Sequence, residues 1–481
     1  MNTLPYLGLG LSSNAQATDL PRPFSLLDAH PGLFDYVEYS APLDVVQARV
    51  EATLFSELER RRGEVPLVYH PVHLNLFGPE LESKERLALA AAHVTAVGSP
   101  WVSNDVGWWH HASTALPGYL YLTPPLTIEG LAQCVRHVEH VREAMPVPLL
   151  IENPVVMTAR GSLHVLDFMA RLSEATGCLL LLDLGHLLSH QLTRGPRLLD
   201  GLAGFPWGRV AQLHLAGGVV TGSAYADDHP QPIRDETWAL FDELRPRCTS
   251  LRAVTYEGDG HPEAVARRVL ERLRRSVASK SETETVSLPR TSAVEAERGE
   301  AQSGDASLLA WRLFDEVHST PGPELDYRLA VIAEQLDAEV PLALAAVAPT
   351  RARLASFASS TTFRDWFERG TRCLSDAFLN WALVEARRPE LAGADALVSL
   401  ELWARTTFAR AKTKPLDTAF PVDLTEAVHA ARVLKRHLTA RGILDGSGWD
   451  GLLQCARRAP RTPWPVRLSV EGARVLISPL S

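Results

Sequence analysis

Long apolar runs, surplus basic charge and cysteine are all scarce in this sequence. The 481 residues carry 48 Lys and Arg against 57 Asp and Glu, and the net charge of -9 argues against a general nucleic-acid binder. The densest apolar run, from Cys178 to Leu182, stops at Asp183, far short of the roughly 20 residues of a membrane span. The first residues, MNTLP, have neither a charged n-region nor an apolar h-region, so we expect no signal peptide.

The cysteines restrict both the compartment and the metal chemistry. The five are odd in number, scattered, and never spaced C-x-x-C; they are Cys134, Cys178, Cys248, Cys373 and Cys455. This distribution argues against a disulfide framework and against a thiolate zinc site. We therefore expect a protein of the reducing cytoplasm, with no membrane contact.

One stretch divides the chain. Residues 277–306 are rich in Ser, Thr, Glu and Ala, contain no aromatic residue and show no sustained hydrophobic period. Such a segment buries too little apolar surface to offset the entropy of ordering it, so we interpret it as a flexible linker. The predicted domains are residues 1–276 and residues 307–481, in line with roughly 150 residues for each domain as a soft guide.

The front domain alternates short β-rich runs with helical patterns. The eight runs are 6–11, 36–39, 67–74, 101–106, 148–152, 178–183, 210–215 and 253–257. Helical patterns between them include 42–61, 83–97, 127–144, 163–176, 235–244 and 262–275. This count and spacing predict an α/β fold, a (β/α)8 TIM barrel. The competing doubly wound sheet lacks its phosphate-binding turn, because Gly8-Leu9-Gly10 has no third glycine at the required place.

The back domain reads as mainly α-helical. Apolar-periodic segments run through 308–317, 327–336, 341–355, 363–386, 394–411 and 424–440. Residues 465–479 alternate like a short terminal β-hairpin around Glu471-Gly472. No repeat or metal motif in this half states its function.

Polar residues suited to binding metal follow nearly every front-half strand. They are Glu38, His70, Asn104-Asp105, Glu152-Asn153, Asp183 with His186, His214, and Glu257 with Asp259, and the loop after the seventh strand adds Asp227, Asp228 and His229. The carboxyl ends of barrel strands meet at one mouth, so these residues should converge there. Imidazoles with carboxylates suit iron, zinc or manganese, and so many donors favour two or three bridged ions. Taken singly, a histidine could be a satisfied core residue and a carboxylate a helix cap or an arginine partner.

The same positions carry motifs that identify a family. The chain reads HPVHL at 70–74, WVSND at 101–105, IENP at 151–154, LDLGH at 182–186, QLHLAG at 212–217, DDH at 227–229 and EGD at 257–259. In this order the motifs resemble the multinuclear non-haem iron-dependent oxidative enzymes, formerly the DUF692 family. The resemblance covers nearly all of residues 1–275 and none of the back half.

The resemblance implies a TIM barrel with two or three iron ions (Fe2+/Fe3+) and dioxygen as co-substrate. It implies oxidative modification of a ribosomally synthesised precursor peptide in natural-product maturation, often at cysteine. The metal ligands carried over are His70, Glu152, Asp183, His186, His214, Asp227, His229 and Glu257. Family members commonly use a small partner protein to capture the precursor peptide, and the back half is a candidate for that role.

Several positions depart from the family pattern. Asp105 stands where the family usually has a histidine ligand, so His110 or His111 could be recruited instead, or one ion held differently. Gly218 and Gly258 replace the histidine and arginine of the usual Ala-Gly-His and Glu-Arg-Asp. These changes leave the ion count and the reaction open.

We assign expected roles on this basis. Asp105, Glu152 and Asp183 should lie closest to the chemistry. Trp108, Tyr119 and Asn153 are predicted to bind substrate, with Trp109 and Tyr121 on the same loop as further candidates. The other histidines should stay outside the site: His30 and His93 as structural residues, His137 and His140 on a helix surface, and His190 on a helix exterior.

Two alternatives belong to other functional classes. A barrel with His and carboxylates at its mouth also suits a redox-inert hydrolase or isomerase that uses zinc, manganese or magnesium. A sugar isomerase would want a strand-end lysine, and the front half is poor in lysine. The second alternative is a peptide-binding scaffold whose site has decayed, for which the Asp105 exchange is the one supporting feature.

Overall fold

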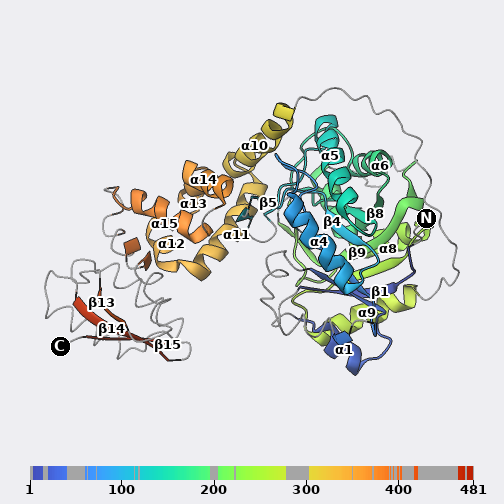
Figure 1. Cartoon of the computed structure of the whole chain (residues 1–481), viewed down its shortest axis with the longest axis horizontal. Coiled ribbons are helices and arrows are strands. Elements are labelled where there is room, and N and C mark those ends of the chain that lie inside the picture. The colour runs from blue at the N-terminus through green and yellow to red at the C-terminus, as the bar shows by residue number, and fades with distance from the viewer. Residues whose placement is uncertain are drawn as a thin grey trace. The chain divides into compact units, whose positions relative to one another are not determined.

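A computed structural model gives the architecture of the chain (Figure 1). It describes residues 4–14, 20–40, 60–61, 63–71, 73–112, 114–116, 120–194, 204–221, 224–277, 303–348, 350–370, 373–388, 391, 394, 398–399 and 401–402, and the backbone of 416–420, 464–471 and 474–479. The helix predicted over 42–61 lies almost wholly outside these residues, and so do those predicted over 394–411 and 424–440.

Eight parallel strands close into a barrel in the order β1-β12-β9-β8-β7-β4-β3-β2, which confirms the predicted fold (Figure 1). Their bounds are β1 Gly8–Asn14, β2 Tyr36–Ser40, β3 Leu67–Tyr69, β4 Val102–Asp105, β7 Leu149–Glu152, β8 Leu179–Asp183, β9 Val210–Ala216 and β12 Ala253–Glu257. Strands such as LLLLD in β8 are buried throughout, because helices cover the outside of the sheet and side chains fill its interior. The third strand is shorter than predicted, so His70 directly follows it.

Helices return the chain between the strands. They are α1 Pro23–Ala29, α4 Lys84–Val97, α5 Ile128–Ala144, α6 Val165–Thr176, α7 Leu184–Arg194, α8 Asp235–Leu244 and α9 Glu263–Val277. Capping side chains fix where α4 and α5 begin, because the hydroxyls of Ser83 and Thr127 accept hydrogen bonds from backbone N–H groups of the first turn. Helix α7 starts immediately after β8, so the strand-end Asp183 is also the start of a helix. Two small hairpins leave the barrel mouth: β5 His110–His111 with β6 Thr114–Ala115, and β10 Gly218–Thr221 with β11 Ala224–Asp227.

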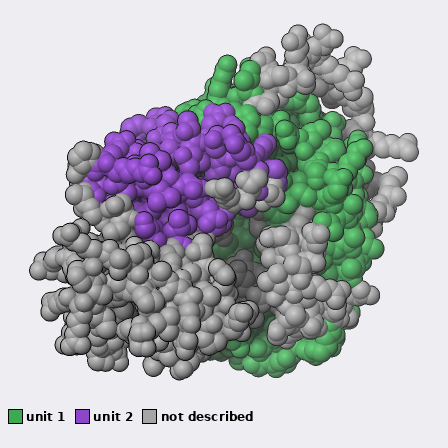
Figure 2. All heavy atoms as spheres, turned by 60° about the vertical axis from the view of Figure 1, so that its left-hand side comes forward, with its two compact units in different colours: residues 1–110, 121–316 green, residues 111–120, 317–481 purple. Residues whose placement is uncertain are grey.

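The chain divides into two compact units, coloured separately in Figure 2. Unit 1 comprises residues 1–110 and 121–316, and unit 2 comprises 111–120 and 317–481. Helix α9 ends at Val277 and α10 (Ser303–Ser319) begins inside the segment predicted as a linker, whose residues 278–302 lie outside the described part of the chain.

Unit 2 is largely helical where it is described. Its helices are α11 Pro323–Glu339, α12 Pro341–Val347, α13 Arg351–Ala358, α14 Thr361–Arg369 and α15 Leu374–Glu385. Aromatic rings from three of them form its core, with Phe357 edge-on to both Phe363 and Phe378. A three-stranded antiparallel sheet follows, β13 Leu416–Phe420, β14 Trp464–Glu471 and β15 Arg474–Pro479, with β14 in the middle. No helix within the described residues is both long and apolar enough to cross a bilayer.

Candidate metal centre

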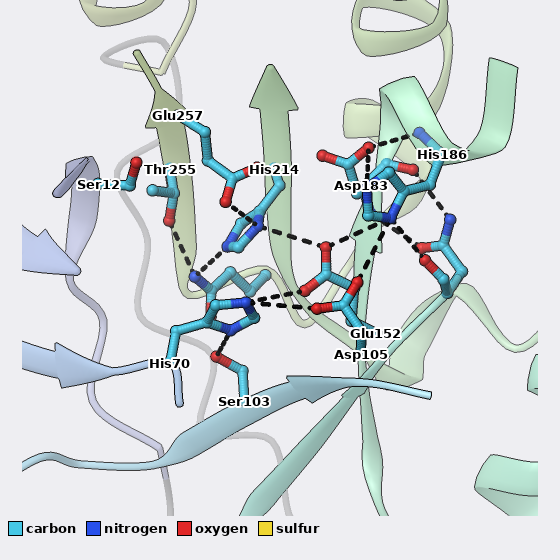
Figure 3. Close-up of polar contacts among 12 residues, drawn as sticks. Ser12, His70, Ser103, Asp105, Glu152, Asp183, His186, His214, Thr255 and Glu257 are labelled. Atoms are coloured by element: carbon cyan, nitrogen blue, oxygen red, sulfur yellow. Dashed lines mark hydrogen bonds and ion pairs between the residues drawn. The ribbon is translucent and has the colours of Figure 1, made fainter. Parts of the chain in front are cut away.

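Acidic and imidazole side chains from seven of the eight strand ends or the loops that follow them converge inside the barrel mouth (Figure 3). They form three groups whose donor atoms all lie within 4.8 Å of one another, and Glu152 belongs to two of them. The groups are His70, Asp105 and Glu152; Glu38, His214 and Glu257; and Glu152, Asp183 and His186. All of these side chains are buried. The convergence predicted from the strand ends is therefore present in the fold.

The first group joins β4 and β7 to the residue after β3. Nε2 of His70 lies 3.6 Å from Asp105 Oδ2 and 3.6 Å from Glu152 Oε2. The other ring nitrogen, Nδ1, lies 3.0 Å from the Ser103 hydroxyl, which fixes the ring so that Nε2 faces the two carboxylates (Figure 3). Asp105 thus occupies a donor position in the group despite replacing the histidine that the family pattern leads one to expect.

The second group centres on His214. Its Nδ1 lies 3.3 Å from Glu257 Oε1 and 3.5 Å from Glu152 Oε1, so Glu152 connects this group to the first. Its Nε2 lies on the opposite side of the ring, 2.7 Å from Glu38 Oε1. Glu38 lies in the middle of β2, and it was among the residues suited to binding metal but not among the ligands that the family resemblance implied.

The third group extends to the loop after β11. Asp183 Oδ1 accepts a hydrogen bond from the backbone N–H of His186, so this carboxylate does cap α7, while its Oδ2 has no hydrogen-bond partner. Asp227 Oδ2 lies 3.4 Å from Nε2 of His186 and 3.1 Å from Nε2 of His229. The far nitrogens of these two rings are also held, His186 Nδ1 by the carbonyl oxygen of Asn153 at 2.8 Å and His229 Nδ1 by Asp259 Oδ2 at 3.0 Å.

This donor set fits metal ions better than it fits a hydrogen-bond network. Two ligands about 2.1 Å from one tetrahedral ion are separated by about 3.4 Å, and most of the imidazole–carboxylate separations here lie between 3.3 and 3.9 Å, beyond hydrogen-bond length. Buried oxygens of Glu152, Asp183 and Asp227 have no hydrogen-bond partner. Within the described residues no Lys or Arg forms an ion pair with any of these carboxylates. Bound cations would supply the missing partners.

Each of the four imidazoles presents one nitrogen to the carboxylates while the other contacts a fixed neighbour, and in His186 the second nitrogen, Nδ1, also lies 3.6 Å from Asp105 Oδ1. The neighbours are Ser103, the Asn153 carbonyl, Glu38 and Asp259. Histidines that bind metal characteristically donate their second N–H to such a group, because it fixes the tautomer and the ring orientation. The arrangement therefore suits bound metal ions.

The crowding of like charges perturbs the pKa values of the metal-free centre. Burial and the neighbouring Asp105 raise the pKa of Glu152 to about 7, and burial raises that of Asp183 to about 6. Burial alone would lower the pKa of His70, but Asp105 and Glu152 outweigh it and raise that pKa to about 9. Without cations the site would hold protons instead, so protons and metal ions compete for it.

Two predicted substrate-binding residues are buried in supporting positions. The Trp108 indole has no exposed surface: it packs edge-on against Trp311 of α10, with ring centroids 4.9 Å apart, and its Nε1 donates to the His110 carbonyl. Asn153 is also fully buried, and its amide exchanges hydrogen bonds with the backbone of Asp183. Both differ from expectation because they position other residues and have no face to offer a peptide.

The remaining aromatic candidates have different positions in the structure. Tyr119 lies outside the described residues. Trp109 and Tyr121 stack with ring centroids 4.0 Å apart and planes within 9°, and the carboxylates of Asp105 and Glu152 act electrostatically on the Tyr121 hydroxyl. This pair therefore stands beside the centre.

Some expectations for the other histidines were wrong. His137 and His190 are buried, not on a helix exterior, and the His190 ring packs against that of His164. His110 does not substitute for the missing histidine ligand, because its Nε2 lies 2.9 Å from Glu82 in a separate cluster. His111 belongs to unit 2, where its ring lies near Phe367. The burial of a single histidine on a helix is hard to predict from the sequence, because it depends on which part of the protein packs against that helix.

Comparison with known proteins bears on the barrel half of the chain. The model of a family described as "RiPP precursor modification enzyme MbnB/TglH/ChrH" matches residues 24–278. A UPF0276 protein of Rhizobium meliloti is 31% identical over 198 residues, which are 40% of this chain and 63% of that protein. A UPF0276 protein of Caulobacter vibrioides is 27% identical over 270 residues, which are 54% of this chain and 91% of that protein.

Solved structures also resemble the barrel. Endonuclease IV from Thermus thermophilus is 16% identical with a TM-score of 0.38, covering 56% of this chain and 99% of its own. A xylose isomerase domain protein from Planctomyces limnophilus is 13% identical with a TM-score of 0.37, covering 57% and 99%.

Proposed function

The chain belongs to the MbnB/TglH/ChrH family of RiPP precursor modification enzymes, and from that premise we propose that it binds two or three iron ions and uses dioxygen to oxidise a precursor peptide at cysteine. The observation that carries the proposal is the shared buried centre of four imidazoles and at least six carboxylates with Glu152 at its middle. Nitrogen and oxygen donors without thiolate suit iron, zinc and manganese. The family resemblance selects iron among them.

The residues of the chain divide the work of holding the ions. Glu152 would help to hold more than one ion, because its two oxygens face different imidazoles. Asp183 and Asp227 lie beside His186, so they would share an ion with it. Iron bound in this way would supply the electrons for dioxygen reduction and an open position for the substrate thiolate.

The aromatic pair beside the centre is proposed to face the peptide in place of Trp108. Burial and nearby carboxylates raise the pKa of Tyr121 well above its usual value, so its hydroxyl keeps its proton. Its oxygen accepts a hydrogen bond from the backbone N–H of Val155, which fixes the ring. A neutral phenol at this place can donate a hydrogen bond to a substrate carbonyl near Asp105.

Unit 2 is proposed to capture the precursor peptide and so to replace, or to bind, a small partner protein. Its support is positional: the family model ends at residue 278, and residues 317–481 with 111–120 form a compact unit of their own. Binding of a labelled precursor peptide to the full chain should weaken when exposed residues of α15 such as Val384 are changed. Unaltered binding across a set of surface variants in unit 2 would count against this role.

The test of the whole proposal is anaerobic purification, metal analysis and a peptide assay. We expect two or three iron ions per chain, and an oxygen-dependent mass change in a short cysteine-containing peptide encoded beside this gene. The same peptide with serine at that cysteine should be unchanged. One zinc ion per chain and no oxygen uptake would refute the oxidase.

A redox-inert hydrolase is the second candidate, because the same donors suit zinc or manganese. Turnover under argon with zinc would favour it. An isomerase gains no support, since Lys84, the lysine of the described barrel helix α4, is exposed at the start of that helix. Retention of iron would exclude a decayed scaffold.

A further inference from the structure

One buried tyrosine beside the third group carries a hydroxyl that the fold leaves unpaired. Tyr225 lies on β11 two residues before Asp227, so the two side chains point to the same face of the strand. Strand β11 packs against α7, the helix that carries His186. The Tyr225 side chain has no exposed surface, and its hydroxyl has no hydrogen-bond partner among the described residues.

Two glycines leave the space that the phenol occupies. A Cβ added at Gly218 would lie 2.0 Å from the Tyr225 hydroxyl oxygen, and one added at Gly185 would lie 2.6 Å from it. Gly218 pairs with Asp227 across the β10–β11 hairpin, and Gly185 is the second residue after Asp183. The Cβ position at Gly185 is also only 3.2 Å from Asp183 Oδ1. The hydroxyl and the Asp183 carboxylate therefore border the same small space.

Charges of the metal centre act on this hydroxyl. Burial raises the pKa of Tyr225, and the carboxylates of Asp227 and Asp183 raise it further, so the phenol is a neutral hydrogen-bond donor in the metal-free protein. Asp227 Oδ1 and Asp183 Oδ2 are themselves buried without a hydrogen-bond partner. A donor and two acceptors thus stay unpaired in one region and do not satisfy one another. Buried polar groups are normally paired, so such a cluster points to a water or an ion that binds among them.

We propose that Tyr225 is a positioning residue of the metal centre, and that its hydroxyl donates a hydrogen bond to a water ligand of the ion in the third group. A catalytic metal site keeps a coordination position for water or substrate, and a neutral phenol can orient that ligand without adding charge to the site. The rival role is structural: a buried water that is present with or without metal would pair with the hydroxyl. The inference rests on the proposed metal centre.

The decisive variant is Y225F, which keeps the ring and removes only the hydroxyl. Because that hydroxyl has no partner before metal binds, chelator-treated Y225F should melt at the wild-type temperature or slightly above it. In competition titrations with zinc, Y225F should bind one ion 10- to 100-fold more weakly, the loss typical when an outer partner of a metal site is removed. The other ions should keep their wild-type affinity.

The matched control is Y39F. The Tyr39 side chain is also buried, but its hydroxyl lies 2.6 Å from His93 Nε2, outside the centre. Y39F should lower the melting temperature of the chelator-treated protein and leave zinc binding as in wild type. If metal-free Y225F is destabilised as Y39F is, or if its zinc affinity is unchanged, the inference is overturned and Tyr225 has a structural role.

A spectroscopic readout tests the neutral state of the hydroxyl. Ferric iron that is bound directly by a phenolate has a charge-transfer band in the visible range. We expect the visible spectrum of the ferric protein to be the same in Y225F as in wild type. A band that is lost in Y225F would make Tyr225 a direct ligand and overturn its role as a donor to water. Failure of the proposed function looks different, because wild-type protein would then bind no set of ions, or would cause no oxygen-dependent change in the peptide.

Discussion

Replacing Glu152 by glutamine should stabilise the metal-free protein and weaken the metal-loaded one. Glu152 is buried among other acids, and burial together with Asp105 raises its pKa from 4.5 to about 7. A carboxyl group whose pKa is raised in the folded state destabilises the fold when it is ionised. This destabilisation is absent below pH 4.5, grows as the pH rises towards 7, and is fully present above pH 7.

The size of the effect follows from that shift. At about 1.4 kcal/mol for each tenfold change in the ionisation constant, ionising Glu152 in the fold costs about 3 kcal/mol. Between pH 5 and pH 8, E152Q should therefore gain about 2–3 kcal/mol in free energy of unfolding relative to wild type. For a unit of this size the melting midpoint should rise by roughly 3–5 °C. With metal the order reverses, because wild type gains about 4 kcal/mol at a free metal concentration 1,000 times its dissociation constant.

Denaturation of chelator-treated protein at pH 5 and pH 8, repeated with ferrous iron under argon, measures both effects. E82Q is a control in which the pKa shift has the opposite sign. His110 and Arg86 outweigh the effect of burial and lower the pKa of Glu82 to about 2. The ionised Glu82 therefore stabilises the fold fully above pH 4.5, and this stabilisation is lost as the pH falls through 2. E82Q should therefore be destabilised equally at pH 5 and pH 8. Metal-free E152Q and wild-type curves that stay parallel from pH 5 to pH 8 would refute the reasoning.

Three further outcomes are expected. Trp108→Ala should lower the free energy of unfolding by about 3–5 kcal/mol in denaturant titrations, by leaving a cavity under α10, with the metal content unchanged; a loss of metal would show that its indole serves the centre. Gly217→Ala would place a Cβ 1.8 Å from the Gln231 carbonyl oxygen and displace the loop of the third group, so metal analysis should show fewer ions per chain. The control is Gly208→Ala, whose added Cβ would lie 3.5 Å from its nearest neighbour, and it should show the wild-type metal content. Because the pKa of His70 is about 9 in the metal-free centre, metal affinity in competition titrations should rise from pH 6 to pH 9, and a flat profile would contradict this assignment.

The barrel and the convergence of its donors could be predicted because both depend on local sequence. A parallel strand buried on both faces reads as an apolar run, and in β8 that run ends at Asp183, where the chain enters the mouth. Six other strands also carry a donor near the carboxyl end or in the segment that follows, so the topology brings the donors together. The direction and contacts of any one side chain were harder to predict.

Side-chain direction needs the tertiary structure. Trp108 sits in a loop that the sequence places at the mouth, yet its ring is covered by α10, which lies about 200 residues further along the chain. Asn153 directly follows Glu152 and has the polar side chain of a further site residue, but its amide forms hydrogen bonds with the backbone of Asp183. The hydrogen bond from the Trp101 indole to the Gln212 side chain joins residues 111 positions apart, and it forms only once the barrel is closed.

The placement of donors on nearly every strand has a consequence for biogenesis. Glu38 emerges from the ribosome early and Glu257 late, and the two come together only after β12 has inserted between β9 and β1. A nascent chain that lacks this strand has an open ring and an incomplete set of donors, so complete metal binding at this centre would have to wait for the final strand. A full set of bound ions would therefore indicate that the barrel has closed correctly.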